Sequence, residues 1–118
     1  MQTLANVLVG LVAALHAYIL VLEMFLWERK PGRGLHGFDP EMARATAALA
    51  ANQGLYNGFL AAGLIWGIWL GEAGDAVKLF FLICVAVAGL YGAATVNRRI
   101  ALVQTVPALI AMVCVWLA

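Results

Sequence analysis

The sequence predicts an all-α integral membrane protein, a four-helix bundle with both termini outside, and three observations lead to this prediction. Hydrophobic residues make up 65% of the 118 residues and charged residues only 11%, against ~25% charged residues in soluble domains. The apolar residues gather in four long runs, and basic residues concentrate at two of the three connections between them. This composition excludes a soluble globular domain and a nucleic-acid-binding protein, and it leaves no stretch for a separate catalytic domain.

Each run is long enough to cross a bilayer core, which takes roughly 18 or more apolar residues. Met1 to Leu22 carries no charge, Glu23 is a single interruption, and Trp27 closes the first segment. The other uncharged runs are 45–71, 79–96 and 100–118. The bilayer core offers the backbone no hydrogen-bond partner. We therefore expect one transmembrane domain over residues 1–118, with helices near 2–27, 40–70, 76–97 and 99–117.

The connections are short and carry helix-ending and helix-starting signals. Asp39-Pro40-Glu41 predicts the start of the second helix, with a cap acceptor, a proline at the first helical position and an acid at the positive helix end. The second connection is expected at 71–75, and the third is a turn at 97–99. The residues that end the first helix are Pro31, Gly32, Gly34 and Gly37.

The basic residues predict the orientation in the membrane. Six of the seven flank the first and third connections, whereas Lys78 alone lies near the second. The positive-inside rule therefore places the first and third connections in the cytoplasm and both termini outside. We expect Trp27 at the inner interface and Trp66, Trp69 and Trp116 at the outer one. The six basic residues are Arg29, Lys30, Arg33, Arg44, Arg98 and Arg99.

Polar residues within the runs gather at one depth. At ~1.5 Å of rise per residue, Glu23 lies ~6 Å from the cytoplasmic edge and His16 ~16 Å from it, near mid-membrane. Polar side chains inside a bilayer are costly, so their convergence predicts a ligand-binding site in the cytoplasmic half of the bundle. The further residues of this layer are Asn52, Gln53, Tyr56, Asn57, Tyr91 and Gln104.

The angular positions of these residues agree with a shared site. His16 and Glu23 are seven residues apart, so they fall within ~20° of each other around the first helix. The second helix carries two polar stripes with i, i+4 spacing, one for a cavity and one for a neighbouring helix. The stripes are Asn52 with Tyr56, and Gln53 with Asn57.

A purely structural interpretation stands beside the binding site. Asn, Gln, Thr and Tyr side chains in spans often only hydrogen-bond neighbouring helices. His16 is then a packing residue, and Glu23 forms an ion pair with Arg98 or Arg99 as charge partners. Otherwise Glu23 is a ligand contact or a proton carrier.

A proline, two cysteines and several glycines within the runs are each expected to have a structural role. Pro107 removes a backbone donor to Val103, which predicts a kink in the fourth helix just past Gln104. Cys84 and Cys114 lie inside apolar runs and are expected to fill apolar space rather than to form a disulfide.

Glycines with small-xxx-small spacing predict close helix contacts. They are Gly54, Gly58, Gly63, Gly67 and Gly71.

The sequence carries no catalytic or metal-binding signature. It has no phosphate loop, no HExxH and no CxxC motif, which favours a protein that is not an enzyme. His16 and Glu23 supply only two potential ligands, so we predict no metal site and no cofactor. His36 lies on the glycine-rich first connection and is expected in solvent.

Four segments resemble a family of small bacterial membrane proteins, the domain-of-unknown-function family thirteen-oh-four. They are 16–27 (HAYILVLEMFLW), 52–63 (NQGLYNGFLAAG), 89–95 (GLYGAAT) and 104–108 (QTVPA), and the resemblance covers essentially the whole chain. It implies four spans, a multi-pass protein of the bacterial inner membrane and no established activity. Some members carry an epimerase label, but nothing here resembles epimerase chemistry. The motif residues coincide with the polar layer, which favours a site over packing alone.

The predicted function is the binding or transport of a small amphipathic molecule, with Glu23 as the charged contact or the proton-exchanging group. One alternative is a membrane enzyme that acts on a lipid-soluble substrate, with Glu23 or His16 as acid or base and Tyr91 as a donor. Another is a structural or assembly protein. The expected partners are the lipid bilayer, the small molecule and a second copy of the chain in a homo-oligomer, with a dimer favoured. Four short helices leave little interior, so the glycine-rich outer half of the second helix is expected to contact that copy.

Overall fold

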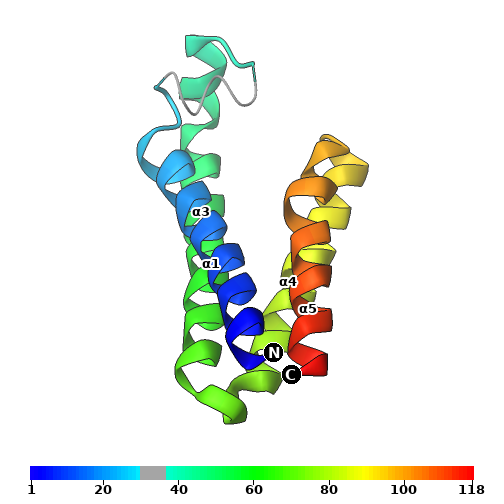
Figure 1. The fold of residues 1–118 in the computed structure, drawn as a ribbon. Coiled ribbons are helices and arrows are strands. Elements are labelled where there is room, and N and C mark those ends of the chain that lie inside the picture. Colours follow the sequence, from blue (N-terminus) through cyan, green and yellow to red (C-terminus); the bar gives the residue numbers. More distant parts are fainter. Residues whose placement is uncertain (30–36) are drawn as a thin grey trace. The chain divides into compact units, whose positions relative to one another are not determined.

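The computed structural model describes residues 1–29 and 37–118, and in them the chain forms four α-helices and no strand. This confirms the prediction of an all-α fold with four helices. Two short helical turns join them, the 3-10 turn η1 (Gly71–Gly74) and the π-helical turn η2 (Ala101–Thr105). The helices are α1 (Gln2–Phe25), α3 (Pro40–Trp69), α4 (Asp75–Thr95) and α5 (Val106–Leu117) (Figure 1). The predictions for Lys30, Pro31, Gly32, Arg33, Gly34 and His36 lie outside the described residues.

The chain divides into two compact units, and α1 and α3 each pass through both. We call Leu15–Phe59 the hairpin unit, because it holds the end of α1, the first connection and most of α3. We call Met1–Ala14 with Leu60–Ala118 the core unit. Both chain termini belong to the core unit, where they lie at the same end as η1 (Figure 1).

In the hairpin unit, side-chain hydrogen bonds fix both ends of the first connection. Asp39 Oδ1 accepts a hydrogen bond of 2.7 Å from the backbone N–H of Met42, so Asp39 caps α3 as the sequence predicted. On the other side, Trp27 Nε1 donates to Thr46 Oγ1 at 2.9 Å, and the Trp27 ring meets Phe38 edge to face. Trp27 therefore joins the residues after α1 to the first turns of α3.

The core unit is built on apolar side chains from all four helices. The α4 and α5 helices run side by side there (Figure 1). A buried hydrogen bond of 3.0 Å links α4 to the turn η2 that precedes α5, from Thr105 Oγ1 to the Ala86 carbonyl oxygen. The buried cluster consists of Ala5, Val9, Val12, Ala13, Leu64, Leu82, Val85, Ala86, Ala108, Ala111 and Val115.

Glycines allow the helices of the core unit to come into contact, as predicted for Gly63 and Gly67. A Cβ atom at Gly63 would collide with the Phe81 ring, and one at Gly67 would stand 3.1 Å from the backbone nitrogen of Lys78. Both partners lie on α4 of the same chain. Gly63 and Gly67 of α3 therefore contact α4 of the same chain, and a contact of α3 with a second copy stays a prediction.

Gly71 has a different role from the one predicted. No atom lies within 4 Å of the position that its Cβ would take, and its φ is +67°. L-residues rarely adopt this backbone conformation, whereas glycine adopts it at little cost. The prediction of a close helix contact at Gly71 is therefore wrong, because α3 ends at Trp69 and this glycine makes the turn into η1.

The predicted kink site in the fourth helix is occupied by a π-helical turn. The N–H of Val106 bonds to the carbonyl oxygen of Ala101, five residues back, and Pro107 follows directly. Proline lacks the N–H that would bond to Val103 in a regular α-helix. Local π geometry is one of the ways in which transmembrane helices accommodate a proline.

Lys78 is buried, whereas its position in the sequence indicated only that it lies near the second connection. The α4 helix begins at Asp75, so Lys78 lies within its first turns, with its side chain 0% exposed. Its ammonium group contacts Asp75 Oδ1 at 3.2 Å. Because the pair has i, i+3 spacing, both charges lie on one side of the helix and neutralise each other locally.

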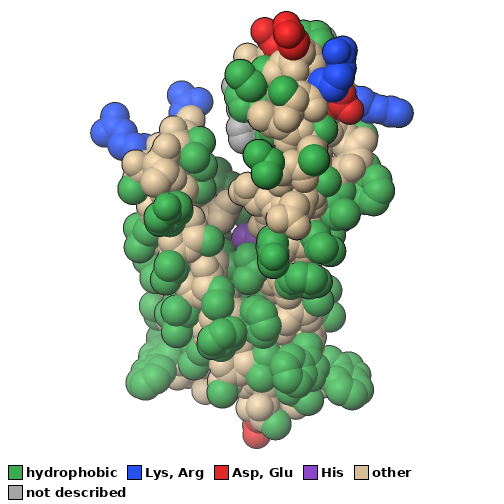
Figure 2. All heavy atoms as spheres, turned by 180° about the vertical axis from the view of Figure 1, so that it is seen from behind, with side chains coloured by type: hydrophobic (Ala, Val, Ile, Leu, Met, Phe, Trp, Pro, Cys, Tyr) green, Lys and Arg blue, Asp and Glu red, His purple; other side chains and the backbone are tan. Residues whose placement is uncertain are grey.

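Two helices of the described residues are long and apolar enough to cross a membrane. They are α1 and the segment Gly71–Thr95, which comprises η1 and α4. The segment Ala101–Leu117 is apolar but shorter, and α3, with its central polar residues, is not among them. In the face shown in Figure 2, hydrophobic side chains cover the sides of the helices and charged side chains lie at helix ends.

Gly67→Leu is expected to destabilise the protein, because the new side chain would displace Lys78 and the start of α4. Overpacking of this kind costs roughly 1–3 kcal/mol. Thermal unfolding in mild detergent measures the effect. Ile65→Leu is the matched control, since Ile65 lies two residues earlier on α3 and is 58% exposed. Equal melting temperatures for the two variants would show that this helix contact does not form.

Candidate functional site

The candidate site centres on Glu23, a carboxylate buried near the end of α1. The residue is only 9% exposed. Its Oε1 accepts a hydrogen bond of 2.8 Å from Asn57 Nδ2 on α3. The same Asn57 nitrogen also donates to the Gln53 carbonyl oxygen at 3.1 Å. The Asn57 amide is therefore held by its own helix while it binds the carboxylate.

Two glycines on α3 make this hydrogen bond possible. A Cβ atom at Gly54 would stand 3.0 Å from Glu23 Cβ and 3.3 Å from the Leu20 carbonyl oxygen, and one at Gly58 would stand 2.5 Å from Leu20 Cδ1. Larger residues would hold the two helices apart. The predicted close contact at Gly54 and Gly58 is confirmed, and it lies at the level where Asn57 reaches Glu23.

No cation of the hairpin unit compensates the Glu23 carboxylate among its described residues. The ion pair that the structure shows joins Lys78 and Asp75 in the other unit. Arg44 precedes Asn57 by 13 positions on α3, which corresponds to about 20 Å along the helix axis. Arg29 is exposed and follows the end of α1.

The charge partners that the sequence suggested, Arg98 and Arg99, belong to the core unit and are both exposed. The backbone N–H of Arg99 donates to Asn97 Oδ1 at 2.9 Å, which caps the turn before the last helix. An ion pair of either arginine with Glu23 stays a prediction.

The second carboxylate oxygen of Glu23 is open to a further contact. Oε2 accepts no hydrogen bond from the described residues. Oε2 is also not among the fully buried side-chain atoms without a hydrogen-bond partner, so part of its surface is accessible. A carboxylate accepts several hydrogen bonds through its two oxygens. One oxygen of Glu23 is thus fixed by Asn57 and the other is available.

The remaining predicted site residues of the hairpin unit differ in burial. His16 is completely buried on α1. Asn52, Gln53 and Tyr56 are exposed on α3. Tyr56 precedes Asn57 by one residue, so it points ~100° away from the Asn57 direction, and its ring meets Phe59 edge to face. The stripe of Asn52 and Tyr56 therefore lies on another face of α3 from the one that contacts α1.

Tyr91 and Gln104 lie in the core unit. Tyr91 is 72% exposed, and its carbonyl oxygen accepts a hydrogen bond of 2.7 Å from Thr95 Oγ1. Gln104 is half-buried in η2, with its Cβ 3.1 Å from the position that a Cβ of Gly89 would take. The convergence of these two residues with Glu23 stays a prediction.

Sequence reasoning missed three polar contacts that the structure shows. They are the ion pair of Lys78 with Asp75, the hydrogen bond of Trp27 with Thr46, and that of Thr105 with the Ala86 carbonyl. The i, i+3 spacing was a signal for the first. The other two join residues 19 positions apart, and no periodicity within one helix reveals such a pair.

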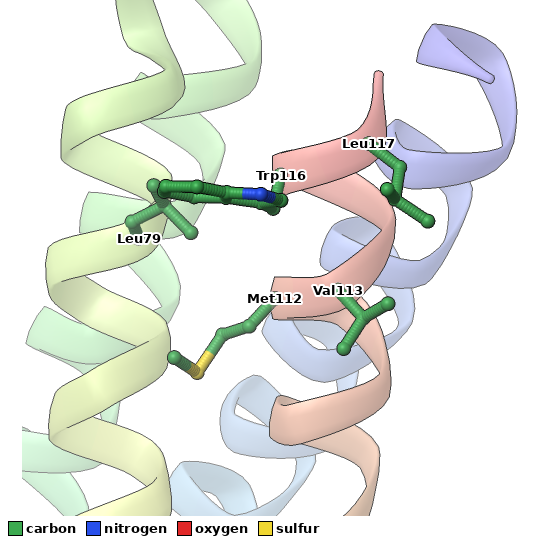
Figure 3. A pocket seen from close by; sticks show the side chains of 5 residues that line it. All are labelled: Leu79, Met112, Val113, Trp116 and Leu117. Carbon is green, nitrogen blue, oxygen red and sulfur yellow. The ribbon is translucent and has the colours of Figure 1, made fainter.

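An apolar pocket lies between α4 and α5 in the core unit. Its volume is about 270 Å³. Figure 3 shows Met112 and Trp116 extending from α5 toward Leu79 on α4. Val113 and Leu117 complete the lining, and no predicted site residue takes part. The lining side chains offer hydrocarbon contacts and no charge. Among the residues that the structure describes, no group of three or more His, Cys, Asp or Glu side chains is placed to hold a metal ion.

Comparisons with known proteins place this chain in a family. The family described as "Protein of unknown function (DUF1304)" matches residues 10–116. The chain is also 32% identical over 115 residues to "Uncharacterized protein YpaA" of Lactococcus lactis subsp. lactis (strain IL1403), which covers 95% of this chain and 97% of that protein. No solved structure matches. The chain therefore belongs to the family of proteins of unknown function DUF1304, as the resemblance of its motifs implied.

Proposed function

We propose that this chain is a four-span protein of the bacterial inner membrane that binds or transports a small amphipathic molecule in the cytoplasmic half of its helices. Glu23 is its charged contact. The observation that carries the proposal is the buried Glu23 carboxylate, which one neutral amide holds through Oε1 while Oε2 stays available.

Membrane insertion is supported by the length and composition of the helices. Two helical segments, Gln2–Phe25 and Gly71–Thr95, are each long and apolar enough to cross a bilayer. A third segment, Ala101–Leu117, is apolar over 17 residues. Many large apolar side chains are exposed on the helices, such as Leu11, Phe80 and Ile110. Exposed apolar surface on this scale is unfavourable in water and favourable in lipid. In this proposal α3 also spans the bilayer, and its polar residues face partners rather than lipid.

A carboxylate at position 23 is energetically unfavourable if the contact between α1 and α3 is only structural. A glutamine at position 23 would offer the same acceptor oxygen to Asn57 without a charge. Placing a charged side chain within a bilayer costs about 2.5–3.5 kcal/mol on insertion scales. The extra cost of an acid over an amide favours a role for the charge, as a contact to a ligand or as a proton carrier.

Glu23→Gln is expected to fold normally and to lose the bound molecule. The amide retains an acceptor for Asn57 Nδ2, so the melting temperature should change little, whereas the charged contact disappears. Glu23→Asp keeps the charge but withdraws it by one methylene group, and it should retain part of the activity. The measurement is mass spectrometry of small molecules that co-purify with each variant extracted in native-lipid nanodiscs, together with thermal unfolding.

Glu28→Gln is the matched control for this experiment, because Glu28 is exposed beyond the end of α1. It should carry the same small molecules as the unmodified protein. Identical sets of co-purified molecules from the unmodified protein and from Glu23→Gln would refute the binding function and leave the structural role.

Orientation in the membrane can be tested with single cysteines in a background that lacks Cys84 and Cys114. Glu28 and Ala73 are both exposed, the first just after α1 and the second just after α3. The positive-inside rule predicts that Ala73→Cys reacts with an impermeant maleimide in intact cells, while Glu28→Cys reacts only after permeabilisation. The opposite labelling pattern would invert the proposed topology.

The proposed homo-oligomer is a dimer. Its support is the exposed polar stripe of Asn52 and Tyr56 on α3, since polar side chains within a bilayer require a partner. Native mass spectrometry in mild detergent should show a dimer as the main species. Asn52→Leu should shift it toward monomer, and Leu49→Ala, which alters an exposed apolar side chain one turn earlier, should not. A monomer as the main species of the unmodified protein contradicts the proposal.

A further inference from the structure

The chemistry around Glu23 restricts the kind of ligand that this carboxylate can accept. The one hydrogen bond that it receives from residues 1–29 and 37–118 comes from a neutral amide. Neutral donors orient a carboxylate but leave its negative charge in place. Within a low-dielectric environment an uncompensated charge interacts strongly with any charge that approaches it. An anionic ligand is repelled there, and a neutral ligand leaves the charge unpaired.

The residues beside the carboxylate are apolar. On α1, Leu20 and Met24 flank Glu23 and fill the contact with α3, where Gly54 and Gly58 receive them. A ligand that reaches Oε2 therefore meets hydrocarbon as well as one negative oxygen. Small hydrated inorganic cations need several oxygen ligands. Among the described residues no group of three or more His, Cys, Asp or Glu side chains is placed to hold such an ion.

We propose that the Glu23 site takes a monovalent amphipathic cation, an organic ammonium or phosphonium ion with apolar substituents. This inference rests on the proposed function and assigns its ligand class. The cation compensates the carboxylate at Oε2, Asn57 holds Oε1, and the apolar substituents pack against the side chains of α1. The selectivity is for charge and apolar surface rather than for a particular skeleton.

Two probes of the same shape and opposite charge test the proposal directly. Tetraphenylphosphonium and tetraphenylborate are titrated calorimetrically into the purified full chain in dodecyl maltoside, a detergent without charge, with empty micelles as the blank. The phosphonium ion should bind to the unmodified protein and to Glu28→Gln. Its affinity should fall at least about tenfold in Glu23→Gln, as expected for the loss of a charged contact, and less in Glu23→Asp. Tetraphenylborate should bind no more strongly than to the blank.

Competitors identify the source of the cation. Octylammonium and a short-chain phosphatidylethanolamine are each added against bound tetraphenylphosphonium. Displacement by octylammonium alone indicates a free amine with a net positive charge, and displacement by both shows that the ammonium group of a zwitterionic lipid head group also fits. Either result supports the cationic ligand class.

Three results would overturn the proposal. They are equal or preferential binding of tetraphenylborate, no binding of tetraphenylphosphonium to the unmodified protein, and binding only after Arg98→Gln and Arg99→Gln, which would reveal an internal counterion. The co-purification experiment tests the binding function independently of these three results. The binding function survives if Glu23→Gln still loses co-purified molecules, and it fails if the co-purified sets are identical.

Discussion

The close contact of α1 with α3 at Gly54 and Gly58 is the constraint on which the hairpin unit depends. A Cβ atom at either position would lie within 3.0 Å of a side-chain atom of α1. The helices therefore approach at a distance that only glycine permits there. In lipid, where apolar side chains gain nothing by leaving the solvent, such close packing is a main source of helix association. It also sets the position of Asn57, whose amide reaches Glu23 only at this separation. Stability and site geometry thus rest on the same two residues.

The fold was predictable from the sequence wherever a signal acts within one segment. The apolar runs, the cap at Asp39 and the close contact at Gly54 depend on spacing along the chain, and the structure shows each of them. Gly71 was misassigned because spacing alone does not distinguish a glycine that permits a contact from one that permits a positive φ. The continuation of the small-xxx-small pattern past the end of α3 concealed the turn.

The site was predictable as a set of residues but not as a set of contacts. Depth arithmetic selected Glu23 and Asn57 separately. Their hydrogen bond joins residues 34 positions apart in the chain, and it depends on the rotation and offset of the two helices that carry them. The same limit applies to Lys78, whose burial follows from the packing of α4 on Gly67. Rise and angle per residue fix positions on one helix. The register between two helices depends on how their side chains pack against each other. The residues that make these contacts are far apart in the sequence, and no periodicity shows which of them pair.

The π-helical turn before Pro107 has a consequence for how this family tolerates changes in length. A π turn holds one residue more than an α turn, so η2 contains a surplus position between two regular helical segments. A relative that lacks one residue between positions 101 and 105 can close the turn as ordinary α-helix and keep the packing of α5 on α4. A deletion elsewhere in α5 would rotate every later side chain by ~100°. Single-residue gaps among relatives are therefore expected at this turn, and an alignment that instead places them within 108–117 would misregister the buried positions Ala108, Ala111 and Val115.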